Sequence, residues 1–185
     1  MQTIYEACPI FQNEVICLVQ TKMEDAKELL MCYSDKEAVP FFNADNCHGD
    51  TFYYDTLEKM EQAISFWCEA YELKAFVRWT ILLKETNEKI GTVEMFNRGR
   101  DEHVGVHGIL RIDLQSKYEK REIVASILDI ANEAFYEAFG VEYMITKAIP
   151  NAIERIDALE SKQYTKIDES KFGINNYYGR KCTNE

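Results

Sequence analysis

The sequence lacks the features of several protein classes. No apolar run approaches the roughly 20 residues that a membrane-spanning helix needs. The first residues, MQTIYEACPIFQNEV, carry glutamates and no basic start, so no signal peptide is expected. Positive charge is scarce: the net charge of -11 and pI of 4.8 disfavour nucleic acid phosphate and anionic membranes as partners. We therefore expect a cytoplasmic protein without nucleic-acid or membrane partners.

Closely spaced cysteines are also missing. No C-x-x-C pair occurs, and metal sites and small disulfide scaffolds have tighter cysteine spacing than this chain. We expect reduced, mostly buried thiols in a reducing compartment, and no metal. The cysteines are Cys8, Cys17, Cys32, Cys47, Cys68 and Cys182.

What is present is an ordinary globular composition, 46% hydrophobic and 29% charged. A length of 185 residues suits one well-cored domain and is short for two. There is no linker, repeat or low-complexity segment, so the whole chain, 1–185, is predicted to be a single domain.

Hydrophobic periodicity predicts alternating strands and helices in one mixed α/β domain. Thr21, followed by Glu24, predicts a capping box at the start of the first helix. Gly140 predicts the end of the third helix, as a C′ glycine. The strands are expected at 14–20, 75–85, 89–98, 104–115, 141–149, 164–168 and 175–182, and the helices at 21–35, 55–73, 122–139 and 152–163.

One connection, RIDLQSKYEKREIVAS (111–126), passes directly from a strand into a helix. Helix N-termini after strands commonly hold phosphate, usually with glycines that let backbone N–H groups approach the anion. The position of this turn suggests a phosphate site. Its composition does not, because it contains no glycine.

The order of these elements, together with three stretches, resembles the GNAT family of N-acetyltransferases, in particular its RimJ/RimL-like branch. The stretches are 15–43 (VICLVQTKMEDAKELL and onward), 79–98 (WTILLKETNEKIGTVEMFNR) and 108–167 (GILRIDLQSKYEKREIVAS and onward). The resemblance implies an α/β fold with a central, mostly antiparallel twisted sheet and helices on both faces. It also implies a splayed parallel strand pair, here ILRIDL and YMITKAI.

The chemistry implied by the resemblance is transfer of an acetyl group from acetyl-CoA to a primary amine, by direct attack in a ternary complex. Pantetheine would run between the splayed strands and pyrophosphate would lie on the turn and helix N-terminus. The acceptor would be a small-molecule or peptide amine; the acidic surface favours a cationic one, and a homodimer is left open. The matching cofactor-binding positions are Ile112, Asp113, Leu114, Lys120, Arg121, Glu122, Ile123, Val124 and Asn151.

The chain departs from the family at the turn, where the pattern is Q/R-x-x-G-x-G/A. Lys120, Glu122 and Val124 stand on the small positions, and Glu122 adds negative charge. Lys117 and Arg121 still favour an anion, whereas an ordinary charged turn capped by Glu122 is the alternative. The corresponding functional alternative is a non-catalytic GNAT-fold binding module that has lost efficient CoA binding.

Catalytic residues are proposed on two strands. Glu94 and Asp113 are carboxylates inside apolar strands, where burial raises the pKa toward the range useful to a general base. The alternative for each is a structural ion pair with Arg111 or Arg98. The family's usual tyrosine acid is replaced by Leu159, and the later Tyr164 is interpreted as a core residue first.

Two further groups have open interpretations. His103 and His107 lie four residues apart, as metal ligands do, but no third ligand has a recognisable spacing, and His107 suits a substrate-side polar group better. The aromatic residues of the 38–54 segment either line an acceptor pocket or pack this loop over the sheet. They are Phe41, Phe42, Phe52, Tyr53 and Tyr54.

Overall fold

A computed structural model describes residues 3–169 and 175–183 of the chain. The strands are β1 (Phe11–Gln12), β2 (Ile16–Gln20), β3 (Val77–Leu83), β4 (Glu88–Asp101), β5 (Gly105–Leu114), β6 (Tyr143–Lys147), β7 (Thr165–Lys166) and β8 (Tyr177–Lys181). The helices are η1 (Met23–Asp25), α1 (Ala26–Tyr33), η2 (Val39–Phe41), α2 (Leu57–Glu72), η3 (Ser116–Tyr118), α3 (Arg121–Ile130), η4 (Ala131–Phe135), α4 (Tyr136–Phe139) and α5 (Ile153–Ser161).

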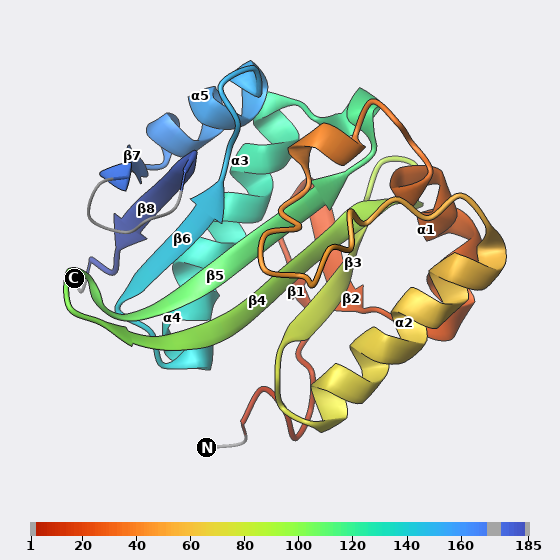
Figure 1. Cartoon of the computed structure of the whole chain (residues 1–185), viewed down its shortest axis with the longest axis horizontal. Coiled ribbons are helices and arrows are strands. Elements are labelled where there is room, and N and C mark those ends of the chain that lie inside the picture. Colours follow the sequence, from red (N-terminus) through yellow and green to blue (C-terminus); the bar gives the residue numbers. More distant parts are fainter. Residues whose placement is uncertain (1–2, 170–174, 184–185) are drawn as a thin grey trace.

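In the described ranges the strands form a single sheet in the order β1-β2-β3-β4-β5-β6-β8-β7 (Figure 1). Neighbouring strands run antiparallel, except that β5 and β6 are parallel. The predicted fold class, a mixed and mostly antiparallel sheet with one parallel pair, is confirmed.

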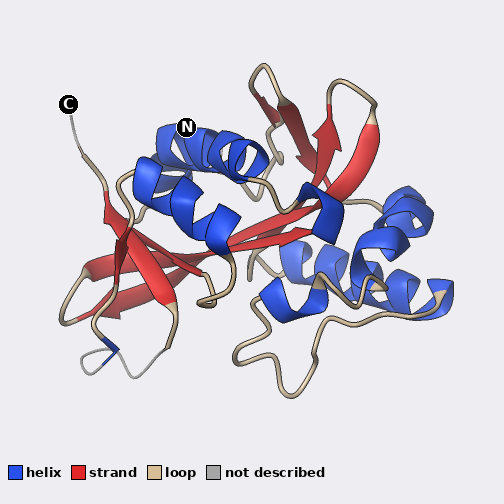
Figure 2. Ribbon diagram, turned by 90° about the horizontal axis from the view of Figure 1, so that it is seen from above, coloured by secondary structure: helices blue, strands red, loops and turns tan. Residues whose placement is uncertain are grey.

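Helices cover both faces of this sheet (Figure 2). The α3–α5 pair packs on one face, over a core that includes Trp79, Val93, Ile127 and Phe135. The α1–α2 pair packs on the other, with a second core that includes Leu29, Tyr33, Met60 and Trp67. We call this second side the loop face, because residues 38–54 cross it.

The predicted strands and helices are found close to their expected ranges, but the first helix begins differently. Thr21 still pairs with β3 through its N–H and the carbonyl of Arg78, and its hydroxyl accepts a hydrogen bond from Thr80. The N-cap is therefore Lys22, whose N–H donates to the Asp25 carboxylate at 3.0 Å. The expected Thr21 capping box is wrong because the sheet uses this hydroxyl.

The predicted 122–139 helix is continuous but not uniform. A π-helical segment, Ala131–Phe135, separates α3 from α4. Gly140 ends the helix with φ 61° and ψ 44°, the left-handed conformation that glycine adopts without steric cost. The expected C′ glycine is thus present in the structure.

The cysteines differ from expectation in burial. All six are free thiols within the described part of the chain, but Cys32 alone is fully buried. The others are half-buried because they lie in loops, at an edge strand or on a partly exposed helix face. Over the same described residues, no helix combines the length and apolar character needed to cross a bilayer.

Candidate active site

The parallel strands β5 and β6 separate before β5 ends. Their ladder runs from His107 opposite Tyr143 to Leu110 opposite Thr146. Beyond it β5 continues to Leu114 and remains paired with β4 on its other side. The β6-facing edge of Arg111–Leu114 therefore lies outside the strand ladder, and we call this region the strand splay.

A cavity of about 780 Å³ lies on the loop face next to the strand splay. Ile109 and Ile145 form its floor on the last rungs of the ladder, and Arg111, the first residue of the splay, lines it as well. We call it the loop-side cavity. Its other lining residues are Asp45, Asn46, His48, Phe96, Arg98, Arg100, Asp101, His107 and Tyr177.

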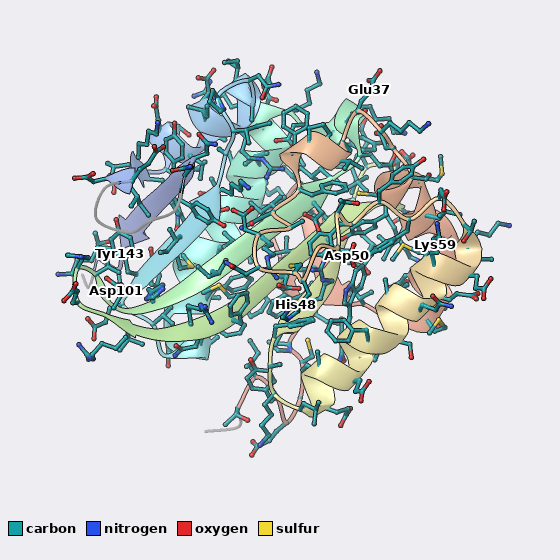
Figure 3. The ribbon with its side chains drawn as sticks, in the orientation of Figure 1. Glu37, His48, Asp50, Lys59, Asp101 and Tyr143 are labelled. Atoms are coloured by element: carbon teal, nitrogen blue, oxygen red, sulfur yellow. The ribbon has the colours of Figure 1, made fainter. Side chains whose placement is uncertain are left out.

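The loop that covers this cavity is attached to the sheet by polar contacts. The Tyr177 hydroxyl lies 3.0 Å from Asn43 Oδ1 and 3.0 Å from Asp45 Oδ2. Lys147 Nζ donates to Asp45 Oδ1 at 2.6 Å. Figure 3 shows His48 and Asp50 on this loop in front of the sheet. Contacts from β6 and β8 thus hold the loop over the strand splay.

The aromatic residues of the 38–54 segment pack the loop rather than line the cavity. Phe42, Phe52 and Tyr54 belong to the core under α1 and α2. The cavity-lining aromatics are instead Phe96 of β4 and Tyr177 of β8. The sequence left two interpretations of these aromatic residues open, and the structure supports packing of the loop over the sheet.

Beneath the loop lies a buried ionic cluster, the Arg78 network, formed by Arg78, Glu94, Asp113, Tyr33 and Arg111. Arg78 donates to Glu94, to Asp113 Oδ2 at 3.0 Å and to the Tyr33 hydroxyl at 2.8 Å. Arg111 donates to the other oxygen of Glu94. Glu94 and Asp113 are 1% and 0% exposed, so their predicted burial is present.

The two predicted bases have different environments in this network. Glu94 is held between two guanidinium groups, Arg78 and Arg111, and each of its oxygens accepts a hydrogen bond from one of them. For Asp113, burial outweighs the nearby Arg78 charge and the Tyr33 hydrogen bond, and raises the pKa above its ordinary value. Because arginines use both oxygens of Glu94, Asp113 is the better candidate of the two for a general base.

Near the start of α3, two backbone donors are occupied by carboxylates of the chain itself. We call residues Gln115–Lys120 the α3 turn. Ser116 N donates to Asp35 Oδ2 at 2.8 Å, and Arg121 N, the first amide of α3, donates to Glu154 Oε2 at 2.9 Å. The carboxylate at this helix start therefore comes from Glu154 of α5, not from Glu122.

The same turn is anchored by a buried ion pair. Arg155 donates to both oxygens of Glu119, at 2.6 and 2.8 Å, and to the Phe41 carbonyl at 3.2 Å. Both side chains of the pair are nearly inaccessible. Arg155 therefore joins α5, the α3 turn and the 38–54 loop.

The remaining predicted cofactor positions are divided between surface and core. Lys120 is the extended N-cap of α3, and Arg121, Glu122 and Asn151 are exposed. The structure groups Lys120–Val124 at one helix start and Ile112–Leu114 on the strand splay. Ile112, Leu114 and Val124 are buried, and Ile123 is half-buried.

Residues near the end of α5 are structural. Leu159 is fully buried. Tyr164 is 1% exposed, donates its hydroxyl to Asn132 Oδ1 at 2.9 Å, and has its pKa raised well above the ordinary value by burial. Tyr164 thus has the core position that the sequence favoured for it.

The two histidines have separate surroundings. His103 lies in the exposed β4–β5 turn with its Nε2 3.4 Å from Glu102, whereas His107 lines the loop-side cavity. Among the described residues, no group of three or more His, Cys, Asp or Glu side chains is placed to hold a metal ion. His107 thus lines a cavity, and its role as a substrate-side group remains a prediction.

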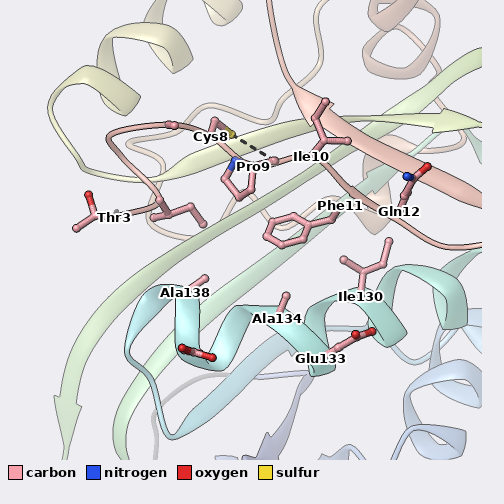
Figure 4. Close-up of a pocket in the computed structure, with 13 residues that line it drawn as sticks. Thr3, Cys8, Pro9, Ile10, Phe11, Gln12, Ile130, Glu133, Ala134 and Ala138 are labelled. Atoms are coloured by element: carbon pink, nitrogen blue, oxygen red, sulfur yellow. Dashed lines mark hydrogen bonds between the residues drawn. The ribbon is translucent and has the colours of Figure 1, made fainter. Parts of the chain in front are cut away.

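A second cavity, of about 990 Å³, lies between the N-terminal segment and the helix α3–η4–α4 (Figure 4). Pro9, Ile10 and Phe11 face Ile130 and Ala134 across it, and Glu133 and Glu137 stand on the helix. None of its lining residues belongs to β5 or β6, so it is separate from the strand splay.

Sequence reasoning missed several residues of this region. Arg78 carried a signal, because an arginine inside the apolar strand VRWTILL needs a buried carboxylate partner. Asp35, Glu154 and Arg155 carried none, since they lie in polar segments and meet the α3 turn only through the tertiary fold.

No family model matches the sequence. One curated relative, the uncharacterized N-acetyltransferase YoaA of Bacillus subtilis, is 30% identical over 88 residues. This match covers 46% of the present chain and 44% of YoaA, so it spans less than half of either protein.

Solved structures with this fold are acetyltransferases. The ribosomal-protein-S5-alanine acetyltransferase of Vibrio fischeri has a TM-score of 0.65 at 18% identity, covering 94% of this chain and 97% of that one. RimJ of Mycobacterium smegmatis, in complex with CoA-disulfide, has a TM-score of 0.71 at 10% identity, covering 93% and 86%. At these identities the likeness establishes the fold: the chain has the GNAT fold, and its expected resemblance to the RimJ/RimL-like branch is confirmed.

Proposed function

We propose that this protein is a GNAT-type acyltransferase that moves an acetyl group from acetyl-CoA to the primary amine of a small molecule or peptide. The observation that carries the proposal is that the loop-side cavity reaches the strand splay at Arg111. An acceptor in the cavity and a thioester between the strands would meet at Arg111. The fold likeness to CoA complexes such as RimJ supports the same conclusion.

The strand splay fits a pantetheine chain, because the free edge of Arg111–Leu114 supplies backbone donors and acceptors to its amides. In the proposed reaction the amine nitrogen forms a bond with the thioester carbonyl carbon, the carbon–sulfur bond breaks, and CoA leaves as the thiolate. The amine proton passes to Asp113, our first choice of base, with Glu94 second.

The α3 turn fits pyrophosphate less well. Lys120 and Arg121 supply positive charge there, but the Arg121 N–H is already bound to Glu154. An incoming phosphate would have to displace this carboxylate. We propose that Ile112–Leu114 and Lys120–Val124, with Asn151, form the acetyl-CoA site, and that Glu154 weakens it.

Calorimetric titration with acetyl-CoA tests the proposal. A Kd in the micromolar range, about -8 kcal/mol of binding free energy, is expected for a working enzyme. Mass spectrometry of an amine library incubated with acetyl-CoA and the protein then identifies the acetylated acceptor. Absence of binding heat at millimolar acetyl-CoA would contradict the proposal.

A second candidate is a GNAT-fold binding module without transferase activity, which the Glu154–Arg121 contact favours. For this module, amine ligands bind in the loop-side cavity while acetyl-CoA neither binds nor reacts. The same calorimetry distinguishes the two candidates. A single domain, a homodimer and a cytoplasmic location remain predictions under either.

A further inference from the structure

The loop-side cavity contains polar groups without partners. His107 Nδ1 and Arg111 Nε are both buried, and neither has a hydrogen-bond partner among the described residues. Both side chains line the cavity. Buried polar groups are normally paired. Arg111 Nε can only donate, and His107 Nδ1 donates in the tautomer that protonates it, so together they favour a ligand that accepts hydrogen bonds.

The charges around these donors are mainly positive. Arg98, Arg100 and Arg111 line the cavity, against Asp45 and Asp101 as its acidic residues. Arg98, on the exposed part of β4, has no ion pair within the part of the chain that the structure describes. A cation on the cavity rim is therefore available to a ligand.

Each of the two acidic residues already has a hydrogen-bond partner within the chain, and for Asp45 this partner is a cation. Asp45 receives Lys147 Nζ at 2.6 Å and the Tyr177 hydroxyl at 3.0 Å. Asp101 accepts the backbone N–H of His103 at 2.8 Å, in the turn at the far end of β4 and β5 (Figure 3). Arg111 is paired with Glu94 and Arg100 lies 3.9 Å from Glu142, so among the arginines that line the cavity only Arg98 lacks an ion pair within the described residues.

We propose that the acceptor is an anionic amine: a small molecule in which an acidic oxygen-bearing group, a carboxylate or a phosphate, lies near the amine. His107 and Arg111 hold the acidic group, Arg98 attracts it from the rim, and Phe96 and Ile109 pack against its apolar part. This inference rests on the proposed function and names the substrate class of the same site. It differs from the cationic acceptor that net charge favours, because net charge does not locate a site.

The test compares amines that differ only in the acidic group, by calorimetry without acetyl-CoA. The carboxylate arm is L-phenylalanine against its amide, the phosphate arm is phosphoethanolamine against ethanolamine, and spermidine is the cationic probe. We expect at least one acidic probe to bind about tenfold more tightly than its neutralised partner, with heat detectable at about 10 mM. Equal or tighter binding of both neutralised partners or of spermidine, or heat from neither acidic probe, would overturn the proposal.

Arg98→Glu supplies the matched variant, with Lys84→Glu as control. Both residues are exposed and both changes alter the charge equally, but Lys84 follows β3 and does not line the cavity. Arg98→Glu is expected to weaken the acidic probe about three- to tenfold, less at high salt, and Lys84→Glu to leave it unchanged. An unchanged affinity of Arg98→Glu for the acidic probe would contradict the role assigned to Arg98 at the cavity rim.

The outcomes separate this inference from the proposed function. Binding of an acidic amine without any binding of acetyl-CoA retains the cavity assignment and removes the acyltransferase. Binding and turnover of acetyl-CoA with only neutral or cationic acceptors retains the enzyme and removes the anionic acceptor.

Discussion

The two ends of the proposed acetyl-CoA path differ in how their polar groups are used. At the strand splay and the loop-side cavity, a strand edge is unpaired and the nitrogens His107 Nδ1 and Arg111 Nε lack partners, as far as residues 3–169 and 175–183 are concerned. At the α3 turn, the amides of Ser116 and Arg121 are occupied by the chain's own carboxylates. The splay end therefore offers polar groups to a ligand, whereas two amides at the phosphate end are already paired within the chain.

Each end is supported by a buried arginine that holds its neighbouring side chains in place through carboxylates. The Arg78 network lies under the cavity and fixes Arg111 at the splay. Arg155 holds Glu119 and so fixes the α3 turn. Both arginines are fully buried, so each must keep its carboxylate partners to avoid an uncompensated charge.

The largest effect is expected from Arg78→Met, which removes the cation shared by Glu94 and Asp113. Asp113 loses its guanidinium partner and Glu94 keeps only that of Arg111, so the free energy of unfolding should fall by about 5 kcal/mol. Urea denaturation followed by tryptophan fluorescence measures the loss. The exposed Lys84→Met is the control, and a loss below about 1 kcal/mol in Arg78→Met would show that the network carries little stability.

Arg155→Met tests the other end and should cost somewhat less, about 3 kcal/mol, because one carboxylate rather than two loses a guanidinium partner. The double variant Arg155→Met with Glu119→Leu should recover much of this loss, since it removes both charges. The same urea titration compares the two variants. A double variant less stable than Arg155→Met would contradict a simple ion-pair account.

The pH dependence of stability should reveal the Asp113 environment. Its pKa is 3.8 when unfolded and raised by burial when folded, so between these values the folded chain holds a proton that the unfolded chain has lost. The free energy of unfolding therefore falls as the pH rises from about 4 through the folded pKa. Asp113→Asn should remove this part of the decline, measured as the urea midpoint at several pH values.

The exposed Asp157→Asn controls for the change in net charge. Its pH profile should keep the decline that Asp113→Asn loses. Identical profiles for the wild-type protein and Asp113→Asn would contradict the raised pKa.

Most of the fold was predictable because hydrophobic periodicity is a local signal. The strand ranges followed from it, the helix end at Gly140 followed from the glycine itself, and the family resemblance implied the splay between ILRIDL and YMITKAI. The pairing of Arg78 with Glu94 depended on register: an irregularity between Ile81 and Leu82 shifts the β3–β4 ladder by one residue. No local pattern reports such a shift.

The candidate site was less predictable because its decisive contacts are long-range. The sequence correctly placed the α3 turn between a strand and a helix, and it shows that this turn lacks glycine. Glu154, 33 positions from Arg121, occupies the helix start, and Asp35 approaches Ser116 from 81 positions away. Contacts of this kind depend on how α1 and α5 pack against the rest of the fold, and this packing cannot be predicted from a single sequence.

The smallest expected effect, that of Glu154→Gln on acetyl-CoA affinity, tests the difference between the two ends most directly. Glu154→Gln removes the negative charge at the α3 N-terminus and weakens the acceptor that competes for the Arg121 N–H. A charge at a helix N-terminus is worth about 0.3–1 kcal/mol, so acetyl-CoA should bind about two- to fivefold more tightly by calorimetry. Glu160→Gln, at the other end of α5, changes the net charge equally and should leave the affinity unchanged. Equal affinities in Glu154→Gln, Glu160→Gln and the wild-type protein would mean that pyrophosphate does not use this turn, and the acetyl-CoA path would have to leave the splay by another route.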